Sequence, residues 1–169
     1  MATTAIGEVK DCSFVKIVGR VEPLETPLRG PVGGEECVVY RVVGKTERDR
    51  RIEEERRQDF LLRDDRGDEA IVRGHLATVD TQATSSTTDL TGPVMALLRR
   101  QDVPEWDWNE YGFVERFLKR GCRVAVAGRA HLDKQPDEGG PYRVPRRGQL
   151  VIGDGEEVVL ISDHPAAWS

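Results

Sequence analysis

Residues 121–130 read Gly-Cys-Arg-Val-Ala-Val-Ala-Gly-Arg-Ala, and the rest of the chain can be interpreted around this stretch. Val124 and Val126 alternate with small residues, which is the period-two pattern of a half-buried strand. Gly121 is expected to end a preceding helix, because glycine adopts the left-handed conformation of a helix C-cap most easily. Gly128 is expected where a strand bends or another backbone comes close. A helix that leads into a bent strand is a unit from which barrels are built.

Two helices are predicted before this strand. Residues 93–100 place apolar side chains at helical spacing and end with two arginines, which suit the C-terminal end of the helix dipole. Asn109 is a plausible N-cap for a second helix that runs to Lys119. Trp106, Trp108 and Tyr111 lie between the two helices, where they are expected to plug one end of a barrel. A binding platform is the alternative interpretation of this aromatic trio.

The other apolar segments read as strands. Residues 14–21 contain a V-x-G-x-V pattern that is typical of a strand coiled at a glycine, and residues 37–43 form a second strand. Residues 60–72 predict a hairpin, because two apolar runs flank the turn sequence Asp-Asp-Arg-Gly-Asp. Further short strands are predicted at residues 142–145, 149–152 and 157–162.

Four segments between these elements are predicted to be loops or extensions. Residues 1–10 are a flexible lead-in, residues 22–36 a Pro/Gly-rich connection, and residues 80–92 a mobile Ser/Thr-rich loop. Residues 45–57 alternate Arg and Glu, which indicates either a solvated hairpin extension or short helix with weak ion pairs, or a charged docking surface. Residues 133–140 are a turn-rich loop.

The element order predicts a mainly β, β-rich α+β fold. It approximates a five-stranded Greek-key barrel of the OB type, partly open, with one or two helices inserted before the late strand and an extra strand at residues 37–43. The length of 169 residues suits a single domain spanning residues 1–169.

Composition limits the classes of function. The net charge of −5 disfavours bulk electrostatic attachment to nucleic acid or anionic lipid, although a local basic patch remains compatible with it. No apolar run reaches the roughly 20 residues of a membrane span, and the first residues lack the features of a signal peptide, so we expect a cytoplasmic protein. The three cysteines contain no C-x-x-C pair, which disfavours a thiolate-based structural zinc site.

No catalytic, cofactor or metal motif is present in the sequence. His75, His131 and His164 are each isolated in sequence from another plausible ligand. Cys122 could be paired with His131, but a cysteine inside a predicted barrel strand is expected to be an inert buried thiol. We therefore expect a protein that is not an enzyme and that needs no cofactor.

Several segments resemble the GIDE domain, also called the BAM (beside-a-membrane) domain. The resemblance covers roughly residues 8–165. It rests on residues 15–21 (Val-Lys-Ile-Val-Gly-Arg-Val), Pro27-Leu28, residues 37–41 (Cys-Val-Val-Tyr-Arg), residues 60–67, residues 115–128 and residues 159–163.

This resemblance implies a domain of prokaryotic type that binds partner proteins, whereas the composition indicates that the chain is soluble. Eukaryotic members belong to membrane-anchored RING-type E3 ubiquitin ligases, but this chain lacks RING cysteines and a membrane span, so ligase activity is not expected. The resemblance implies a protein-binding or scaffold module in a larger prokaryotic assembly or signalling or defence system, with membrane contact only through a partner. The candidate partner-binding residues are Arg48, Arg50, Arg51, Arg56, Arg57, Trp106, Trp108 and Tyr111.

Two alternatives remain from the sequence. An OB-like barrel could bind single-stranded nucleic acid if exposed aromatics lay beside a basic groove, and Arg41, Arg63 and Arg73 lie in or near predicted strands. A small thiol-dependent enzyme could use Cys122 or Cys37. Native thiol alkylation without effect would exclude this second alternative.

Overall fold

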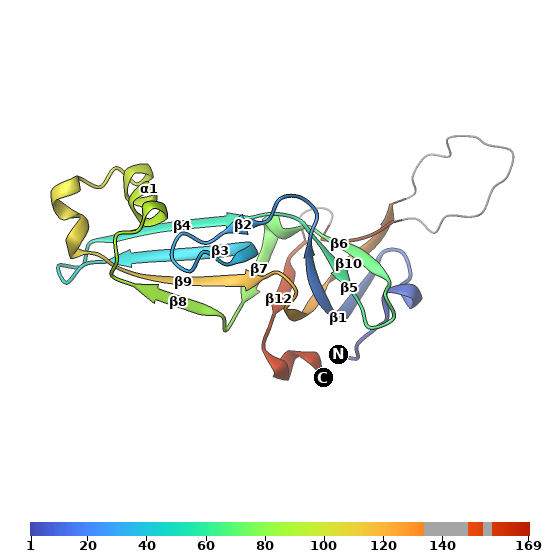
Figure 1. Ribbon diagram of the computed structural model, residues 1–169. Coiled ribbons are helices and arrows are strands. Elements are labelled where there is room, and N and C mark those ends of the chain that lie inside the picture. Colours follow the sequence, from blue (N-terminus) through green and yellow to red (C-terminus); the bar gives the residue numbers. More distant parts are fainter. Residues whose placement is uncertain (134–148, 154–156) are drawn as a thin grey trace, which may run out of the picture.

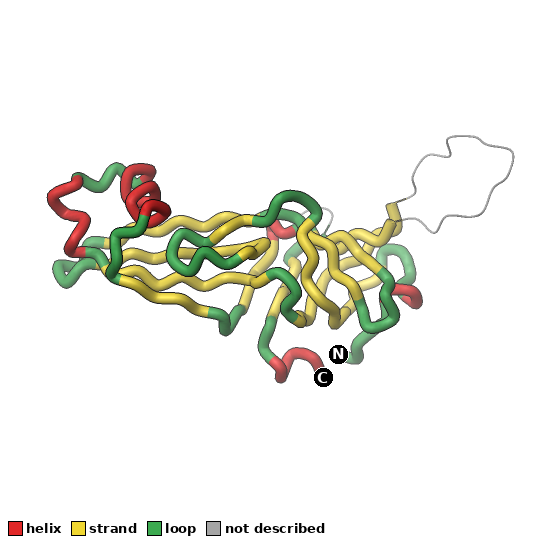
Figure 2. Tube along the Cα trace, viewed as in Figure 1, coloured by secondary structure: helices red, strands yellow, loops and turns green. Residues whose placement is uncertain are grey.

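The computed structural model describes residues 1–133, 149–153 and 157–169. The protein is mainly β, and a closed five-stranded barrel lies at one end of an elongated second sheet (Figure 1). The predicted edge strand at residues 142–145 and most of the loop at residues 133–140 lie outside the described residues. Figure 2 shows strands through most of the molecule, with helical segments around them.

The barrel confirms the predicted OB-like architecture. Its strand order is β1-β5-β6-β11-β10, and pairing of β1 with β10 closes it, whereas the sequence predicted a partly open barrel. Strands β12 and β7 extend the sheet beyond β10, with β7 parallel to β12. The strand bounds are β1 Ser13–Pro23, β5 Phe60–Arg63, β6 Glu69–Val72, β7 Ala77–Asp80, β10 Arg123–Asp133, β11 Gln149–Ile152 and β12 Val159–Ser162.

The barrel interior is filled by alternating apolar side chains. Ile17 and Val21 of β1 are fully buried against residues such as Phe60, Leu62 and Val126. Gly19 lies between the two β1 residues because a Cβ there would come within 2.5 Å of the Arg63 carbonyl oxygen. The predicted coiled strand is therefore confirmed, with a physical reason for its glycine.

The predicted β5–β6 hairpin is also confirmed. Asp64 Oδ1 accepts hydrogen bonds of 3.0 Å from the backbone N–H groups of Arg66 and Asp68, and Gly67 has a φ of +84°. The other oxygen of Asp64 accepts from the Ile6 N–H at 2.9 Å. Ile6 begins the short 3-10 helix η1 (Ile6–Glu8), so the lead-in that was predicted to be flexible packs against the barrel.

The second sheet contains three strands that the sequence analysis missed. The first is β2 (Leu28–Arg29), which pairs with β3 although residues 22–36 were predicted to be a Pro/Gly-rich connection. Residues 109–119 were predicted to be helical, but Gly112–Lys119 form strand β9 after the 3-10 helix η3 (Glu105–Glu110). Residues 80–92 were predicted to be a loop, but Thr84–Thr87 form edge strand β8. The sheet order is β2-β3-β9-β8, with β4 also paired to β3, and the remaining bounds are β3 Glu36–Lys45 and β4 Arg51–Arg57.

Helix α1 (Gly92–Arg100) matches the prediction and covers one face of this sheet (Figure 1). Its apolar face, which includes Leu97 and Leu98, forms a second core with Tyr40 and Phe113. Trp108 and Tyr111 belong to this second core. The expectation that they plug the barrel was therefore wrong, because they lie at the end of the second sheet far from the barrel, and β9 leads the chain from there back to the barrel (Figure 1).

The two sheets join at Gly121, where the chain passes from β9 directly into β10. Gly121 has a φ of +79°, and its N–H donates to the Val21 carbonyl at 2.7 Å. The left-handed conformation predicted for this glycine is present, but the element before it is a strand and not a helix. Val38, Val39 and Leu118 of the second sheet are buried in the barrel core, so the cores meet at this junction.

The chain ends lie on β1. Lys16 donates from its ammonium group to the Ser169 carbonyl, and its own carbonyl accepts from the Thr4 N–H at 2.8 Å. The short 3-10 helices η2 (Gly74–Leu76) and η4 (Pro165–Trp168) complete the described elements. None of the helices in the described ranges is long and apolar enough to cross a membrane.

Candidate partner-binding site

The end of the second sheet far from the barrel presents an exposed tryptophan. We call this region the distal tip and define it as residues 46–50, the turn between β3 and β4, together with residues 105–110 of η3. Trp106 is 74% exposed there, whereas Trp108, two residues later, is 7% exposed and donates its indole N–H to the Val103 carbonyl at 2.9 Å. An exposed tryptophan of this extent is unusual, because its ring is among the largest apolar surfaces a side chain offers.

Trp106 is positioned by Arg50. The Arg50 guanidinium lies 5.8 Å from the centre of the Trp106 ring and forms an ion pair with Asp107. Asp107 is only 5% exposed, so its carboxylate is a fixed anchor for the arginine. The turn itself is ordered, since Thr46 exchanges backbone hydrogen bonds with Arg50 and Asp49, and its hydroxyl accepts from the Arg50 N–H at 3.2 Å.

The structure brings together only part of the predicted partner-binding set. Arg48, Arg50 and Trp106 lie at the distal tip, and Arg48 makes no ion pair or hydrogen bond through its side chain within the described ranges. Trp108 and Tyr111 are buried in the second core and cannot contact a partner directly.

The other three predicted arginines follow strand β4 and are paired with its glutamates. The ion pairs join Arg51 to Glu53 at 3.0 Å, Arg56 to Glu54 at 3.6 Å and Arg57 to Glu55 at 2.6 Å. Strand β4 is therefore part of a charged hairpin with ion pairs, which agrees with the first interpretation given above for residues 45–57, and the docking surface stays a prediction. Such exposed pairs contribute little to stability.

Charge divides the second sheet into two surfaces. The distal tip contains five acidic and two basic residues, a net charge of −3. The sheet face opposite α1 is basic instead, and a hollow of about 240 Å³ lies there beside β7, lined by Arg41, Arg57 and Arg116 together with two threonines. Arg41 and Arg116 stand directly opposite each other on β3 and β9.

A buried glutamate fixes the Pro/Gly-rich loop beside the second core. Glu115 of β9 is fully buried, and its carboxylate accepts hydrogen bonds from the N–H groups of Val32 at 2.8 Å and Gly33 at 3.2 Å. Burial raises the pKa of Glu115, and the two backbone hydrogen bonds oppose that rise. Gly30 is required next to it, because a Cβ there would lie 2.1 Å from a carboxylate oxygen.

Cys37, which is buried, and Cys122, which is half-buried, have the environment of unreactive thiols. Burial raises the pKa of Cys37 to about 12, with a contribution from the nearby Glu115 charge, and raises the pKa of Cys122 to about 11. The imidazole that the sequence analysis paired with Cys122 lies elsewhere: His131 Nδ1 is 3.7 Å from the sulfur of exposed Cys12.

Cys12, His131 and Asp11 form a group of side chains that could hold a metal ion. Their ligating atoms all lie within 4.8 Å of one another. The sequence analysis missed this group because Cys12 and His131 are 119 residues apart, and only the pairing of β1 with β10 brings them together.

In comparisons with protein-family models, curated proteins and solved structures, the chain matches none of them. The resemblance to the GIDE domain therefore stays a prediction from the sequence.

Proposed function

We propose that this protein is a non-enzymatic, GIDE-like binding module that docks a partner protein at its distal tip, around Trp106. The observation that carries this proposal is the highly exposed Trp106 ring, positioned by Arg50 and the buried carboxylate of Asp107. Tryptophan and arginine are the residues most enriched among those that dominate binding energy at protein interfaces. A ring that is already positioned loses little conformational freedom when a partner covers it.

The charge of the distal tip indicates the kind of partner. A net charge of −3 around Trp106 repels nucleic acid and favours a protein surface that carries lysine or arginine beside an apolar pocket. The GIDE resemblance supports a scaffold role of this kind within a larger prokaryotic assembly, with any membrane contact made by the partner.

The proposal is tested by placing a photo-crosslinking amino acid at position 106 in the native host and identifying the crosslinked protein. The same residue at Leu160, which is also exposed but lies on β12, is the control position. We expect a specific adduct from position 106 only, and loss of binding to the recovered protein by at least tenfold with Trp106→Ala. An adduct from both positions, or unchanged binding by Trp106→Ala, would contradict the proposal.

Single-stranded nucleic acid is a second candidate ligand, at a different surface. The basic hollow beside β7 contains three arginines and one glutamate, and the guanidinium of Arg116 makes no hydrogen bond or ion pair within the described ranges. Binding of a fluorescent oligonucleotide that weakens with salt and is lost with Arg116→Glu would support it. No binding at low salt would exclude it.

A further inference from the structure

We propose that Asp11, Cys12 and His131 form a Zn²⁺ site on the barrel, with one coordination position open to solvent or to a fourth ligand. The three side chains supply a thiolate, an imidazole and a carboxylate, which are the donors that Zn²⁺ uses in proteins. This site is independent of the partner-binding function proposed for the distal tip.

The distances fit one tetrahedral ion. With Zn–S and Zn–N bonds of about 2.3 and 2.0–2.1 Å, sulfur and nitrogen ligands of the same ion lie about 3.6 Å apart. The Cys12 sulfur and His131 Nδ1 are 3.7 Å apart, and the Asp11 carboxylate completes a group whose ligating atoms all lie within 4.8 Å. Small side-chain rotations would therefore close the site, with no movement of the backbone.

The backbone around the three ligands is fixed. The β1–β10 ladder reaches Ser13 and Ala130, so Cys12 and His131 are the next residues at its end. Asp11 Oδ1 accepts from the Leu132 N–H at 2.9 Å, and the Cys12 carbonyl accepts from Arg129 at 3.2 Å. Cys12 also has a φ of +57°, a conformation that non-glycine residues seldom adopt.

The site is open to metal ions in solution. Asp11 and Cys12 are exposed and His131 is half-buried, so an ion can reach all three donors. Binding converts the Cys12 thiol to a thiolate and releases its proton to solvent. Two ligands lie before β1 and the third on β10, so a bound ion would join the lead-in to the barrel wall.

The experiment is a titration of the reduced, metal-free full chain with Co²⁺, followed by displacement with Zn²⁺. Cobalt bound by a thiolate absorbs in the near ultraviolet, which reports sulfur ligation directly. We expect one Co²⁺ per chain, loss of this absorption with Cys12→Ser, and affinity lowered by more than about 100-fold with His131→Ala, since loss of a mere partner of a ligand already lowers affinity 10–100-fold.

Two variants serve as controls for the other thiols and for exposed histidine. Cys122→Ser and His75→Ala should bind Co²⁺ as the wild type does, because neither residue belongs to the group. Circular dichroism should show the same fold for every variant, as Cys12 is exposed. The proposal fails if the wild type shows no thiolate absorption, if the absorption survives Cys12→Ser, or if His131→Ala binds as tightly as the wild type.

Discussion

The barrel and the second sheet are both β structures, but different interactions stabilise them. Fully buried aliphatic and aromatic side chains, such as Ile17, Leu62 and Val126, fill the barrel. The second sheet packs α1 on one face and also buries the carboxylates of Glu115 and Asp107, each bound to a loop or turn. The basic opposite face carries no helix within the described ranges.

The two regions therefore differ in what their buried side chains do: those of the barrel hold the strands together, and the buried carboxylates of the second sheet hold loops and turns in place. Apolar packing makes the barrel one closed unit, because every interior side chain contacts several strands. Buried carboxylates are directional, so each fixes one loop in one orientation. The candidate partner-binding site belongs to the second kind of region, where Asp107 fixes Arg50 and Arg50 lies over Trp106.

The largest expected effect is in the barrel core. Phe60→Ala should lower the free energy of unfolding by about 3–5 kcal/mol, because Phe60 is fully buried and its loss leaves a cavity in the barrel. Urea unfolding followed by circular dichroism measures this. Phe14→Ala is the matched control, since Phe14 is 51% exposed on β1, and an equal loss in both variants would contradict the description of the core.

The second largest effect on stability is expected at Glu115, which fixes the Pro/Gly-rich loop on the second sheet. Glu115→Ala should lower the free energy of unfolding by about 2–4 kcal/mol, because the N–H groups of Val32 and Gly33 lose their acceptor and a cavity forms. Urea unfolding of Glu110→Ala, an exposed glutamate close in sequence, should show no measurable change. If the two variants unfold alike, the loop is not fixed by Glu115.

The stability of Glu115→Gln as a function of pH tests whether burial or hydrogen bonding dominates at this carboxyl group. Both oxygens of a protonated carboxyl group can accept a hydrogen bond, whereas the NH2 group of glutamine cannot, so we expect a loss of about 1–3 kcal/mol at low pH. The pKa of Glu115 is raised in the folded protein, so its wild-type contribution is complete below the unfolded value of 4.5 and decreases as pH rises through the folded pKa.

The stability difference between the wild type and Glu115→Gln should therefore narrow from pH 4 to pH 8. Urea unfolding of both proteins across this pH range measures the difference. The contributions of the other titrating groups cancel in this difference because both proteins share them. A difference that widens with pH would show that the backbone hydrogen bonds outweigh burial at this carboxylate.

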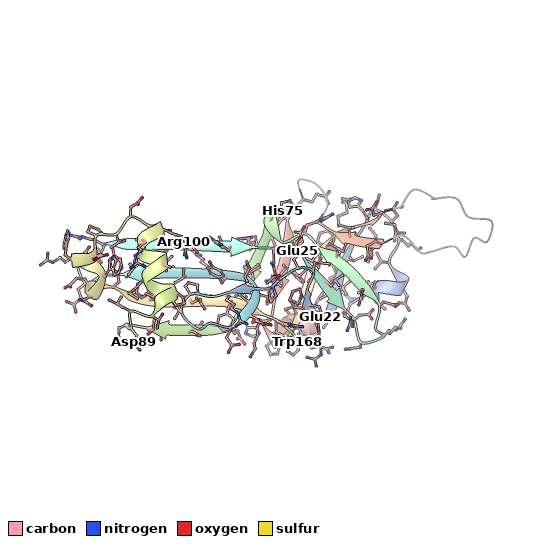
Figure 3. The ribbon with its side chains drawn as sticks, turned by 45° about the horizontal axis from the view of Figure 1, so that its top comes forward. Glu22, Glu25, His75, Asp89, Arg100 and Trp168 are labelled. Carbon is pink, nitrogen blue, oxygen red and sulfur yellow. The ribbon has the colours of Figure 1, made fainter. Side chains whose placement is uncertain are left out.

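The smallest expected effect concerns a polar contact at the edge of the second core. Tyr40 donates its hydroxyl to Glu54 at 2.6 Å. Arg100, labelled at the end of α1 in Figure 3, contributes two further hydrogen bonds to the same carboxylate. Tyr40→Phe should remove about 1 kcal/mol, or about 2–4 °C of melting temperature.

The comparison for Tyr40→Phe is an exposed ion pair on the barrel. Arg63→Ala breaks the pair with Glu69 and should leave the melting temperature unchanged, because solvent screens both groups. A larger effect from Arg63→Ala than from Tyr40→Phe in the same thermal scan would contradict the ranking of buried over exposed polar contacts.

The barrel could be predicted from the sequence because its signals are local. Alternating valines in residues 121–130, the glycine of β1 and the turn at Asp64–Asp68 each specify structure within a few residues. Strand β9 was missed because Phe113 and Phe117 are four residues apart, a spacing that suits one face of a helix and also one face of a strand. Strand β8 was missed because Ser and Thr give no apolar pattern.

The candidate sites depend on contacts that a sequence does not display. Trp106 and Trp108 are two residues apart and alike in type, yet α1 covers only the second, so burial could not be assigned before the fold was known. Cys12 and His131 meet only through the register of β1 and β10. The charged run and the aromatic cluster in the sequence did, however, point to Arg48, Arg50 and Trp106, which lie together at the distal tip.

The closure of the barrel by β1 and β10 has a consequence for the order in which the protein folds. During synthesis β1 leaves the ribosome more than 100 residues before its partner, since Arg20 pairs with Arg123. The hairpins β3–β4 and β5–β6 have partners close in sequence and can form first, whereas long-range pairing is slow. We expect pulse-labelled hydrogen exchange to protect these hairpins before β1. The closed barrel can exist only after β11 has been translated, because β11 lies between β6 and β10.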